Sequence, residues 1–433
     1  MNKLSLSALA AAGLLVGGLT TSSAYAADLG GDCCADLEER VAELEATTVR
    51  KGNRKVSLTV SGWVGQQVMF WDDGVESNTY VHDLGTTLGS HFKFTGSAQI
   101  TPDWSAGYVL HVEAVSSDSL TISQDVDNGP GALGGVQLLQ SYWYLKSESL
   151  GKLSVGQQSQ ASDNAAILVD GSGSLVPANW VAFDVNSFFI RDTFGGDSFG
   201  KTWGGAGPCH SMGGAWGDCN GVPLNSVRYD TPVFGGFSAS ASWGEDDFWD
   251  VAVRYAGELG RFKVAATAAF NQNNGDVGAD DEETLDYFQA GVYIQDIPTG
   301  LFVLGNYGNL QSDVAGEESE TWYVKAGLRK KFFALGHTVL YGEYLNSQAE
   351  EDCTAPFAGF CFGSGNFVQG VLTTESELDV WGVGIVQEID AAAMSLWVKY
   401  RHMEYDDNSL LKAIPGYGYE DFHYVGAGAL ISF

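Results

Sequence analysis

The sequence Tyr424-Val425-Gly426-Ala427-Gly428-Ala429-Leu430-Ile431-Ser432-Phe433 ends the chain and decides how the rest of it is interpreted. Counting back from the terminal aromatic residue, every second side chain is apolar, whereas glycine and serine occupy much of the opposite face. This period of two, sustained over about ten residues, is typical of a tilted β-strand that crosses a bilayer. A single segment of this kind also occurs in soluble sheets, so the interpretation depends on whether the pattern is repeated.

The pattern is repeated along most of the chain. We expect about sixteen strands and therefore an all-β fold, a transmembrane antiparallel β-barrel with a short N-terminal helix. The expected strands are residues 56–68, 92–100, 108–113, 138–145, 152–158, 226–231, 237–244, 249–256, 261–271, 287–295, 301–307, 322–329, 338–345, 378–389, 394–401 and 424–433.

The connections between these strands alternate in length. Short connections are expected at 101–104, 147–151, 232–236, 257–260, 297–300, 331–336 and 390–392. Long connections are expected at 71–89, 115–136, 159–225, 271–285, 308–320, 346–375 and 404–421, and only Glu245-Asp246-Asp247 breaks the alternation. Outer-membrane barrels have short periplasmic turns and long extracellular loops, whereas a soluble sandwich has no reason to sort its connections in this way.

The N-terminus reads as an export signal followed by a separate arm. Lys3, the apolar core Leu4 to Leu19 and the small-residue site at Ala24 and Ala26 predict a signal peptide over residues 1–26. No other run reaches the roughly 20 apolar residues of a transmembrane helix, which excludes a helical membrane bundle. We therefore expect the mature protein in the bacterial outer membrane.

Residues 27–54 are expected to form an N-terminal arm that precedes a barrel over residues 55–433. Within the arm, Leu37, Val41 and Leu44 recur at coiled-coil spacing, which predicts a short helix over Asp36 to Thr47. Two heptads are too few to fold alone. The helix is either part of a solvated arm or a small oligomeric coil, and whether it trimerises or contacts the cell wall stays open.

The charge balance limits the partners. The chain has 22 basic and 54 acidic residues, a formal net charge of −32. A nucleic acid is a polyanion that needs a basic surface, so it is not an expected partner. Disorder, another acidic class, would be poor in aromatic residues, which here make up 12%.

The scarce basic residues fall on the strand faces that would line the lumen. Parity places the following side chains inward: Lys93, Arg228, Arg254, Arg261, Lys263, Lys325, Arg329, Lys399 and Arg401. A charge on the lipid face at mid-depth costs roughly 2–4 kcal/mol, so inward placement is partly forced, and some of these residues could be solvated wall charges without a role in selectivity.

The acidic residues are expected mainly in loops, and the connection 159–225 is the most informative of these. It contains Asp163, Asp170, Asp184 and Asp192 and an apolar patch from Trp180 to Ile190. Such a patch is costly in water, so we expect the loop to fold into the barrel and narrow it, with acids opposite the basic wall. The alternative is a surface lid or receptor loop.

Six cysteines in an exported chain favour disulfides. Cys209 and Cys219 lie within one loop and Cys353 and Cys361 within another, so each pair is expected to close a local ring, whereas the roles of Cys33 and Cys34 are left open. The sequence contains neither an H-E-x-x-H nor a G-x-S-x-G motif. We expect no catalytic residues, no bound metal, no cofactor and no enzymatic activity.

Three segments, DCCADLEERVAELE (32–45), KVSLTVSG (55–62) and SVRYDTP (226–232), together with the terminal Phe433, resemble the general porins of alphaproteobacteria. The resemblance spans the whole mature chain, and its first segment is the most specific. It implies a homotrimer of sixteen-stranded barrels in contact with outer-membrane lipid and lipopolysaccharide. Each barrel would have its third loop folded into the pore and would allow passive diffusion of small hydrophilic solutes and ions.

Two other functions stay open at this point. One is a channel specific for a particular solute. The other is a plugged structural or adhesive barrel that is anchored through its N-terminal coil.

Overall fold

The computed structural model describes residues 56–127, 135–206, 221–276, 282–312, 318–350 and 375–433. The expected signal peptide, the N-terminal arm with its helix and all six cysteines lie outside the described residues. Within them, no helix is both long enough and apolar enough to cross a membrane.

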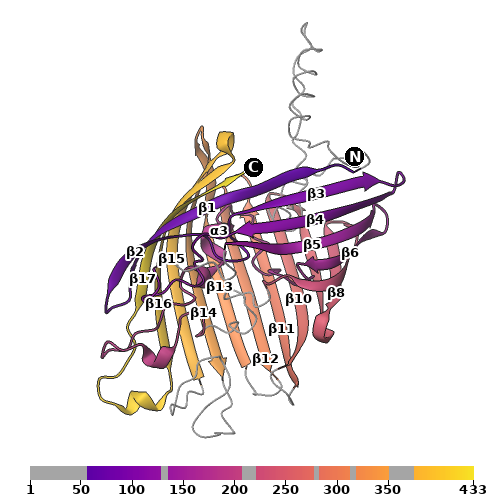
Figure 1. The fold of residues 1–433 in the computed structure, drawn as a ribbon. Coiled ribbons are helices and arrows are strands. Elements are labelled where there is room, and N and C mark those ends of the chain that lie inside the picture. The colour runs from indigo at the N-terminus through magenta and orange to yellow at the C-terminus, as the bar shows by residue number, and fades with distance from the viewer. Residues whose placement is uncertain (1–55, 128–134, 207–220, 277–281, 313–317, 351–374) are drawn as a thin grey trace.

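The described residues form seventeen strands and a few short helices (Figure 1). The strands are β1 (Thr59–Asp72), β2 (Ser77–His82), β3 (His91–Gln99), β4 (Trp104–Ala114), β5 (Val136–Ser147), β6 (Gly151–Gln158), β7 (Leu224–Asp230), β8 (Phe237–Gly244), β9 (Trp249–Leu259), β10 (Phe262–Asp276), β11 (Glu282–Asp296), β12 (Leu301–Ser312), β13 (Glu318–Phe333), β14 (Gly336–Glu350), β15 (Glu375–Ile389), β16 (Met394–Asp407) and β17 (Phe422–Ser432). The helices are α3 (Leu175–Asn179), η1 (Val181–Asp184), η2 (Ser198–Gly200), η4 (Glu245–Asp247), η5 (Asp390–Ala392) and η6 (Leu410–Ala413).

The strands form one antiparallel sheet that closes on itself. From β3 to β17 each strand pairs with the next along the chain, and β1 closes the ring by pairing with β17 from Trp63↔Ser432 to Asp72↔His423. On its other side, the first part of β1 pairs with β3 and the last part with β2, so β2 and β3 share one position. The seventeen strands therefore make a closed barrel of sixteen positions, which confirms the expected fold class.

One expected connection is wrong, because β2 lies within residues 71–89, where the sequence predicts a long loop. Its sequence, Ser77-Asn78-Thr79-Tyr80-Val81-His82, has only two apolar residues and no clear alternation. It forms a strand because it completes the hydrogen bonds of β1, from Gln67↔His82 to Asp72↔Ser77, beyond the point where β3 ends. Pairing with a neighbour, rather than its own pattern, determines this strand.

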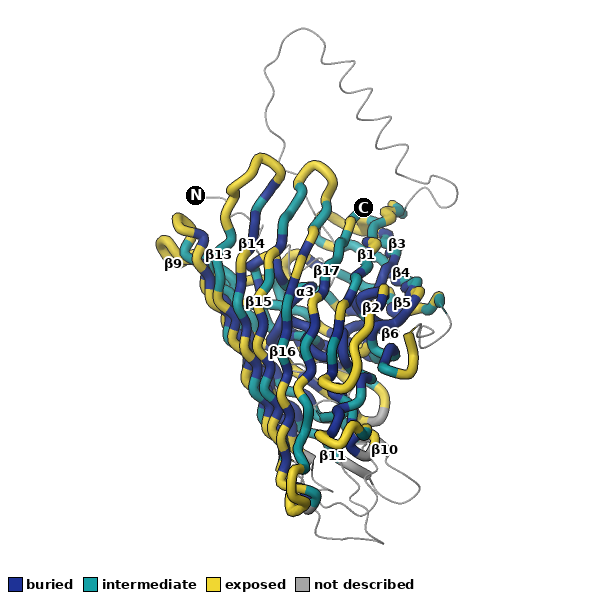
Figure 2. Tube along the Cα trace, turned by 90° about the vertical axis from the view of Figure 1, so that its left-hand side faces the viewer, coloured by how far each residue is buried: buried dark blue, intermediate teal, exposed yellow. Residues whose placement is uncertain are grey.

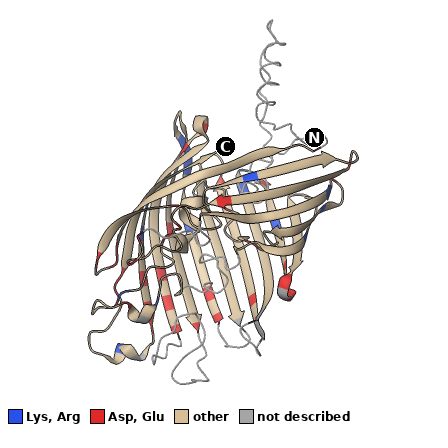
Figure 3. Ribbon diagram, in the orientation of Figure 1, with Lys and Arg blue, Asp and Glu red and all other residues tan. Residues whose placement is uncertain are grey.

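Several strands also extend further than expected towards the rim that carries the long loops. The hairpin of β10 and β11 stays paired as far as Asp276↔Glu282, and that of β13 and β14 as far as Glu318↔Glu350. Figure 3 shows acidic residues near the ends of several strands at this rim. The alternation of apolar and polar side chains stops at the expected edge of the lipid, whereas the backbone hydrogen bonds between the strands continue beyond that edge.

The two faces of the wall differ as expected for a sheet surrounded by lipid (Figure 2). On β13, Trp322 and Val324 are exposed on the outside. The residues that alternate with them, Thr321, Tyr323 and Lys325, are buried on the inside. The other strands place further apolar side chains outward. A contiguous apolar belt of this size on the outside of a closed sheet is a membrane surface.

The seven expected short connections all lie at one rim, where β1 also begins and β17 ends (Figure 1). Gly62 and Phe433 exchange two backbone hydrogen bonds of 3.0 Å there, so the terminal aromatic residue is fixed beside the first strand. The long connections, including the one between β6 and β7, start from the opposite end of the strands.

Candidate functional site

The connection between β6 and β7, of which the structure describes residues 159–206 and 221–223, folds against the inner wall, and we call these described residues the lumen loop. Its aromatic residues are buried: Phe188 lies with its ring centroid 5.2 Å from that of Trp71 on β1 and 5.1 Å from that of Phe422 on β17. Trp180 and Phe183 belong to the same buried apolar cluster. Burial of this cluster against the wall supplies the apolar part of the attachment.

Two buried ion pairs fix the middle of the lumen loop to the opposite wall. The Lys325 ammonium on β13 lies 2.6 Å from Asp170 Oδ2 and donates to Asn179 Oδ1 at 2.5 Å, and the Lys325 and Asp170 side chains are fully buried. A buried ammonium without such partners would be very unfavourable. The loop therefore meets this lysine directly and does not face it across a water-filled gap.

Asp184 is the centre of the second attachment. Its Oδ2 lies 2.5 Å from the Lys399 ammonium and accepts a hydrogen bond of 2.8 Å from Tyr424, while its Oδ1 accepts one of 2.8 Å from Gln67. Burial alone would raise the pKa of this carboxyl, but the ammonium of Lys399 and its hydrogen bond lower the pKa to about 2. Asp184 is therefore ionised throughout the physiological range.

Arg401 joins the loop to a wall acid that the sequence reasoning missed. Its guanidinium lies 2.7 Å from Glu343 Oε1 on β14, and it also donates to the backbone carbonyls of Ala178 and Val181 in the loop. Glu343 in turn accepts a 2.7 Å hydrogen bond from Tyr323. Acids therefore also lie on the described wall, because buried basic residues need acidic partners on neighbouring strands.

The beginning of the lumen loop is held through its backbone. Arg228 Nη1 donates 2.9 Å hydrogen bonds to the carbonyls of Ser159 and Gln160, and the Arg254 guanidinium donates to the carbonyl of Ala161. A second wall acid, Asp250 on β9, accepts hydrogen bonds of 2.6 Å from both the backbone N–H and the hydroxyl of Ser162. Nothing in the sequence pattern singles out Asp250, since a lone acid on a strand has no distinctive spacing.

The fourth expected acid, Asp192, does not contact the basic wall residues. Its Oδ1 accepts hydrogen bonds from the backbone N–H groups of Phe194 (2.8 Å) and Gly196 (3.0 Å), so it stabilises a turn of its own loop. Two loop cations that sequence reasoning passed over make the wall contacts here. Arg191 pairs with Asp73 at 2.8 Å, and Lys201 with Asp407 at 2.5 Å.

The remaining expected residues lie in three different environments. Arg329 pairs with Glu388 at 2.9 Å on the wall. The predicted inward position of Arg261 is wrong, because its side chain lies exposed at the short-turn rim in an ion pair with Asp296. Lys93 is 7% exposed and Lys263 is half-buried. In the part of the chain that the structure describes, neither of these two lysines has a hydrogen bond or ion pair.

Asp163 and Lys93 both line one small cavity. This cavity lies between the wall and the lumen loop and is also lined by His111, Gln140 and Asn164. Asp163 Oδ1 accepts a 2.5 Å hydrogen bond from Asn164. Burial raises the pKa of the Asp163 carboxyl to about 6, against the opposing effects of Ser159 and Asn164.

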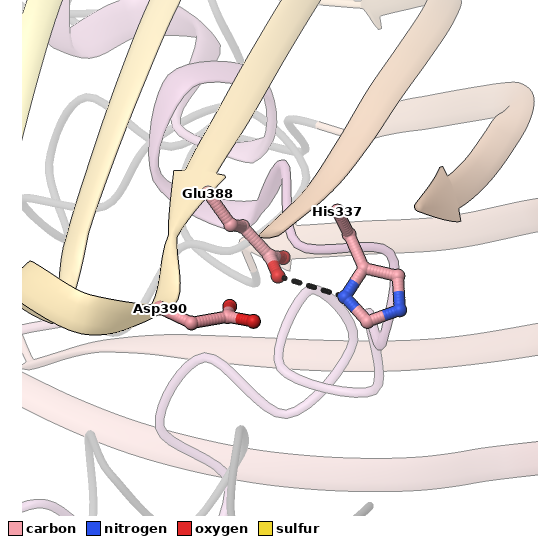
Figure 4. A group of neighbouring side chains, drawn as sticks. All are labelled: His337, Glu388 and Asp390. Atoms are coloured by element: carbon pink, nitrogen blue, oxygen red, sulfur yellow. Dashed lines mark ion pairs between the residues drawn. The ribbon is translucent and has the colours of Figure 1, made fainter. Parts of the chain in front are cut away.

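Two groups of metal-type donors occur among the described residues. His337, Glu388 and Asp390 come together at the short-turn rim (Figure 4), but Arg329 and Lys331 already neutralise the two carboxylates. The other group is His402, Glu404 and Asp421, where the imidazole Nε2 lies 3.0 Å from Glu404 and 3.5 Å from Asp421. Both are ion-pair clusters whenever the histidine is protonated.

Comparisons with known proteins agree with this architecture. The sequence profile of the Gram-negative porin family matches residues 7–429. No curated protein sequence matches the chain.

Among solved structures, the anion-selective porin from Comamonas acidovorans is similar, with 15% identity and a TM-score of 0.55 over 87% of this chain and 100% of that one. OmpT, an outer membrane protein of Vibrio cholerae, has 13% identity and a TM-score of 0.52, with coverage of 89% and 99%. Salmonella typhi OmpF, solved in complex with daunomycin, has 12% identity and a TM-score of 0.51, with coverage of 88% and 99%. At these identities the structures show the fold alone.

The structure is a closed barrel with an apolar outside, a charged inside and a loop folded within it. One family profile matches nearly the whole sequence that forms this barrel. The chain belongs to the Gram-negative porin family, and it is a porin channel of the bacterial outer membrane.

Proposed function

We propose that the channel is water-filled and allows passive diffusion of small hydrophilic solutes and ions, without a reaction or a cofactor. The observation that carries this proposal is the polarity of the wall, with lipid-type side chains outside and charged side chains inside. The lumen loop reduces the cross-section, so selection is by size, biased by charge. The pore-lining residues proposed are Lys93, Asp163, Asp170, Asp184, Asp192, Arg228, Arg254, Lys263, Lys325, Arg329, Lys399 and Arg401.

These residues divide into two roles within the proposal. Buried ion-paired residues such as Lys325, Lys399 and Arg401 hold the loop and fix the pore width. Lys93, Lys263 and Asp163 have no ion pair among the described residues, so they contribute most of the local field. We assign the rim with short turns to the periplasm and the rim with long loops to the cell exterior.

We further propose that the protein is a homotrimeric general porin of the alphaproteobacterial type, embedded among outer-membrane lipid and lipopolysaccharide. OmpT of Vibrio cholerae, similar in fold, is described in a trimer form. The proposed organisation keeps a signal peptide at 1–26, an arm at 27–54, a barrel at 55–433 with its constriction loop at about 159–225, and disulfides between Cys209 and Cys219 and between Cys353 and Cys361.

Liposome swelling tests the proposal. Vesicles that contain the folded protein should swell in isotonic solutions of small sugars, at rates that fall steeply as the sugar becomes larger. Equal rates for sugars of all sizes, or no swelling above that of protein-free vesicles, would contradict size-limited diffusion.

A further inference from the structure

The small cavity between the lumen loop and the first strands of the barrel has unusual chemistry. Its wall side is formed by Lys93 on β3, His111 on β4 and Gln140 on β5, and its loop side by Asp163 and Asn164. Lys93 and His111 are direct cross-strand partners, so both side chains point to the same side of the sheet. The cavity therefore has basic groups on one side and a carboxyl group on the other.

The wall side has polar groups without partners. Lys93 is 7% exposed and makes no hydrogen bond or ion pair with a described residue, and His111 is 3% exposed with both ring nitrogens unpartnered. The neighbouring wall acid Glu113 makes no ion pair with Lys93: its Oε2 accepts hydrogen bonds from the Thr87 backbone (3.1 Å) and from Gln137 (3.0 Å), and its Oε1 is buried without a partner among the described residues. Buried polar groups are normally satisfied, so these donors are available to something that enters the cavity.

The loop side has a carboxyl group without an ion pair, although Arg228 faces it from the wall. Asp163 is 8% exposed and accepts a hydrogen bond from Asn164, but it forms no ion pair with a lysine or arginine among the described residues. Lys93 and Asp163 line one cavity, and no ion pair joins them. The cavity therefore presents an ammonium group and a carboxyl group that do not neutralise each other by direct contact.

We propose that this cavity binds small zwitterionic solutes of the amino-acid class. The carboxylate of the solute would accept hydrogen bonds from the Lys93 ammonium, from a ring N–H of His111 and from the Gln140 amide. Its ammonium would donate to Asp163. This inference deepens the proposed function, because it names a solute class that the diffusion channel retains briefly during passage.

The arrangement discriminates against singly charged solutes. A simple carboxylate satisfies Lys93 but leaves Asp163 without a partner, and a simple amine does the reverse. A zwitterion satisfies both sides, and each charge-assisted hydrogen bond favours it by roughly 1.5–3 kcal/mol, which corresponds to a factor of about 10 to 100. Binding has to be weak enough to permit release, as in any conducting pore.

The test compares three probes of similar size, glycine, acetate and methylammonium, in single-channel recordings at pH 7. Glycine should produce concentration-dependent interruptions of the ionic current at concentrations about 10- to 100-fold below those at which acetate or methylammonium do. K93M and D163N should each weaken the glycine effect by at least about tenfold. Because Lys93 has no hydrogen bond or ion pair with a described residue, K93M removes the charge without breaking a direct contact.

K263M is the matched control, since Lys263 is also an unpaired wall lysine but does not line the cavity. It should shift ion selectivity and leave the glycine effect unchanged. Equal effects of the three probes, or an unaltered glycine effect in K93M and D163N, would overturn the proposal.

Calorimetric titration of glycine into the folded protein in detergent separates this inference from the proposed function. It should show saturable binding that K93M abolishes, whether or not the protein conducts. A conducting barrel without such binding would refute the site and leave the diffusion channel intact. A silent barrel with saturable binding would refute the diffusion channel and leave the site intact.

Discussion

At the scale of single residues, the lumen is organised by buried charges that are neutralised in place. Asp184 shows this most clearly, because one carboxyl group meets Lys399, Tyr424 and Gln67 from three strands. Such pairs add little net stability relative to apolar residues, but the loss of one partner leaves a buried charge uncompensated. Their role is therefore to specify where the lumen loop lies.

K399M should destabilise the barrel by about 3–5 kcal/mol, since it strands Asp184 without its ammonium partner. The double variant K399M/D184N should recover a large part of that loss, because the remaining group is neutral. Urea unfolding in lipid vesicles measures both. K331M, which removes an exposed ion pair with Asp390, is the control and should change stability by less than about 0.5 kcal/mol. Equal effects of K399M and K331M would show that the buried pair is not an anchor.

Asp163 should make ion selectivity depend on pH. Its pKa of about 6 lies above the ordinary value, so the carboxyl is neutral below that pH and negative above it. Arg228 and Asp250 face it from the wall, and Lys93 lines the same cavity. Cation preference, measured as a reversal potential under a salt gradient, should fall as pH is lowered from about 8 to about 5. D163N should show the low cation preference of the wild type at pH 5 at both pH values, and identical titration of the two proteins would contradict this role.

At the scale of elements, the lumen loop lies against β11 at a distance that only glycine permits. A Cβ atom on Gly291 would lie 2.2 Å from the backbone oxygen of Ala166 in the loop. Gln289 on the same strand fastens the loop by accepting from the Ala166 N–H at 2.7 Å and donating to the Ser162 carbonyl at 3.0 Å.

G291V should push the loop away from β11 into the lumen by about 1 Å or more, because normal contact begins near 3.4 Å. Single-channel conductance should therefore fall. G305V is the matched control on the adjacent strand β12, where a Cβ meets nothing within 4 Å. Unchanged conductance in G291V, or an equal fall in G305V, would contradict this position of the loop.

The alternation of side chains along each strand predicts which wall residues face the lumen, but it does not predict which residues they contact. It predicted that Lys325 and Lys399 point inward, but which acid meets which lysine depends on the path of the lumen loop, which has no period. Residues 338–345 show no clear alternation of apolar and polar side chains in the sequence, and this too has a physical cause. On β14, Val339 and Tyr341 are buried inward while Leu340 and Tyr344 face outward, because lipid covers one face and the lumen loop covers the other. Glu343 was missed within this doubly apolar strand.

At the scale of the whole molecule, the pairing of β1 with β17 closes the sheet into a ring, and the apolar belt takes the place of a conventional protein surface. Outward side chains such as Trp322, Val383 and Val398 contact lipid and not a protein core. The number of strands and the sorting of their connections could be predicted from the sequence because both follow from this environment. The strand β2 could not, since its pairing depends on where β3 ends.

V383K should destabilise the barrel by about 2–4 kcal/mol in a bilayer, because it places a charge near the middle of β15 on the lipid face. E377K, on the same face but near the strand end, should cost at most about 1 kcal/mol. Folding yield and urea unfolding in vesicles provide the comparison. Equal, small effects of both substitutions would mean that this face does not meet lipid.

Single-channel conductance in a planar bilayer tests the central claim, an open water-filled channel, most directly. The folded protein should insert with large, ohmic current steps, and a trimer should close in three steps at high voltage. Demonstrably folded protein that inserts but passes no current would contradict the claim, and would mean that the lumen loop plugs the barrel.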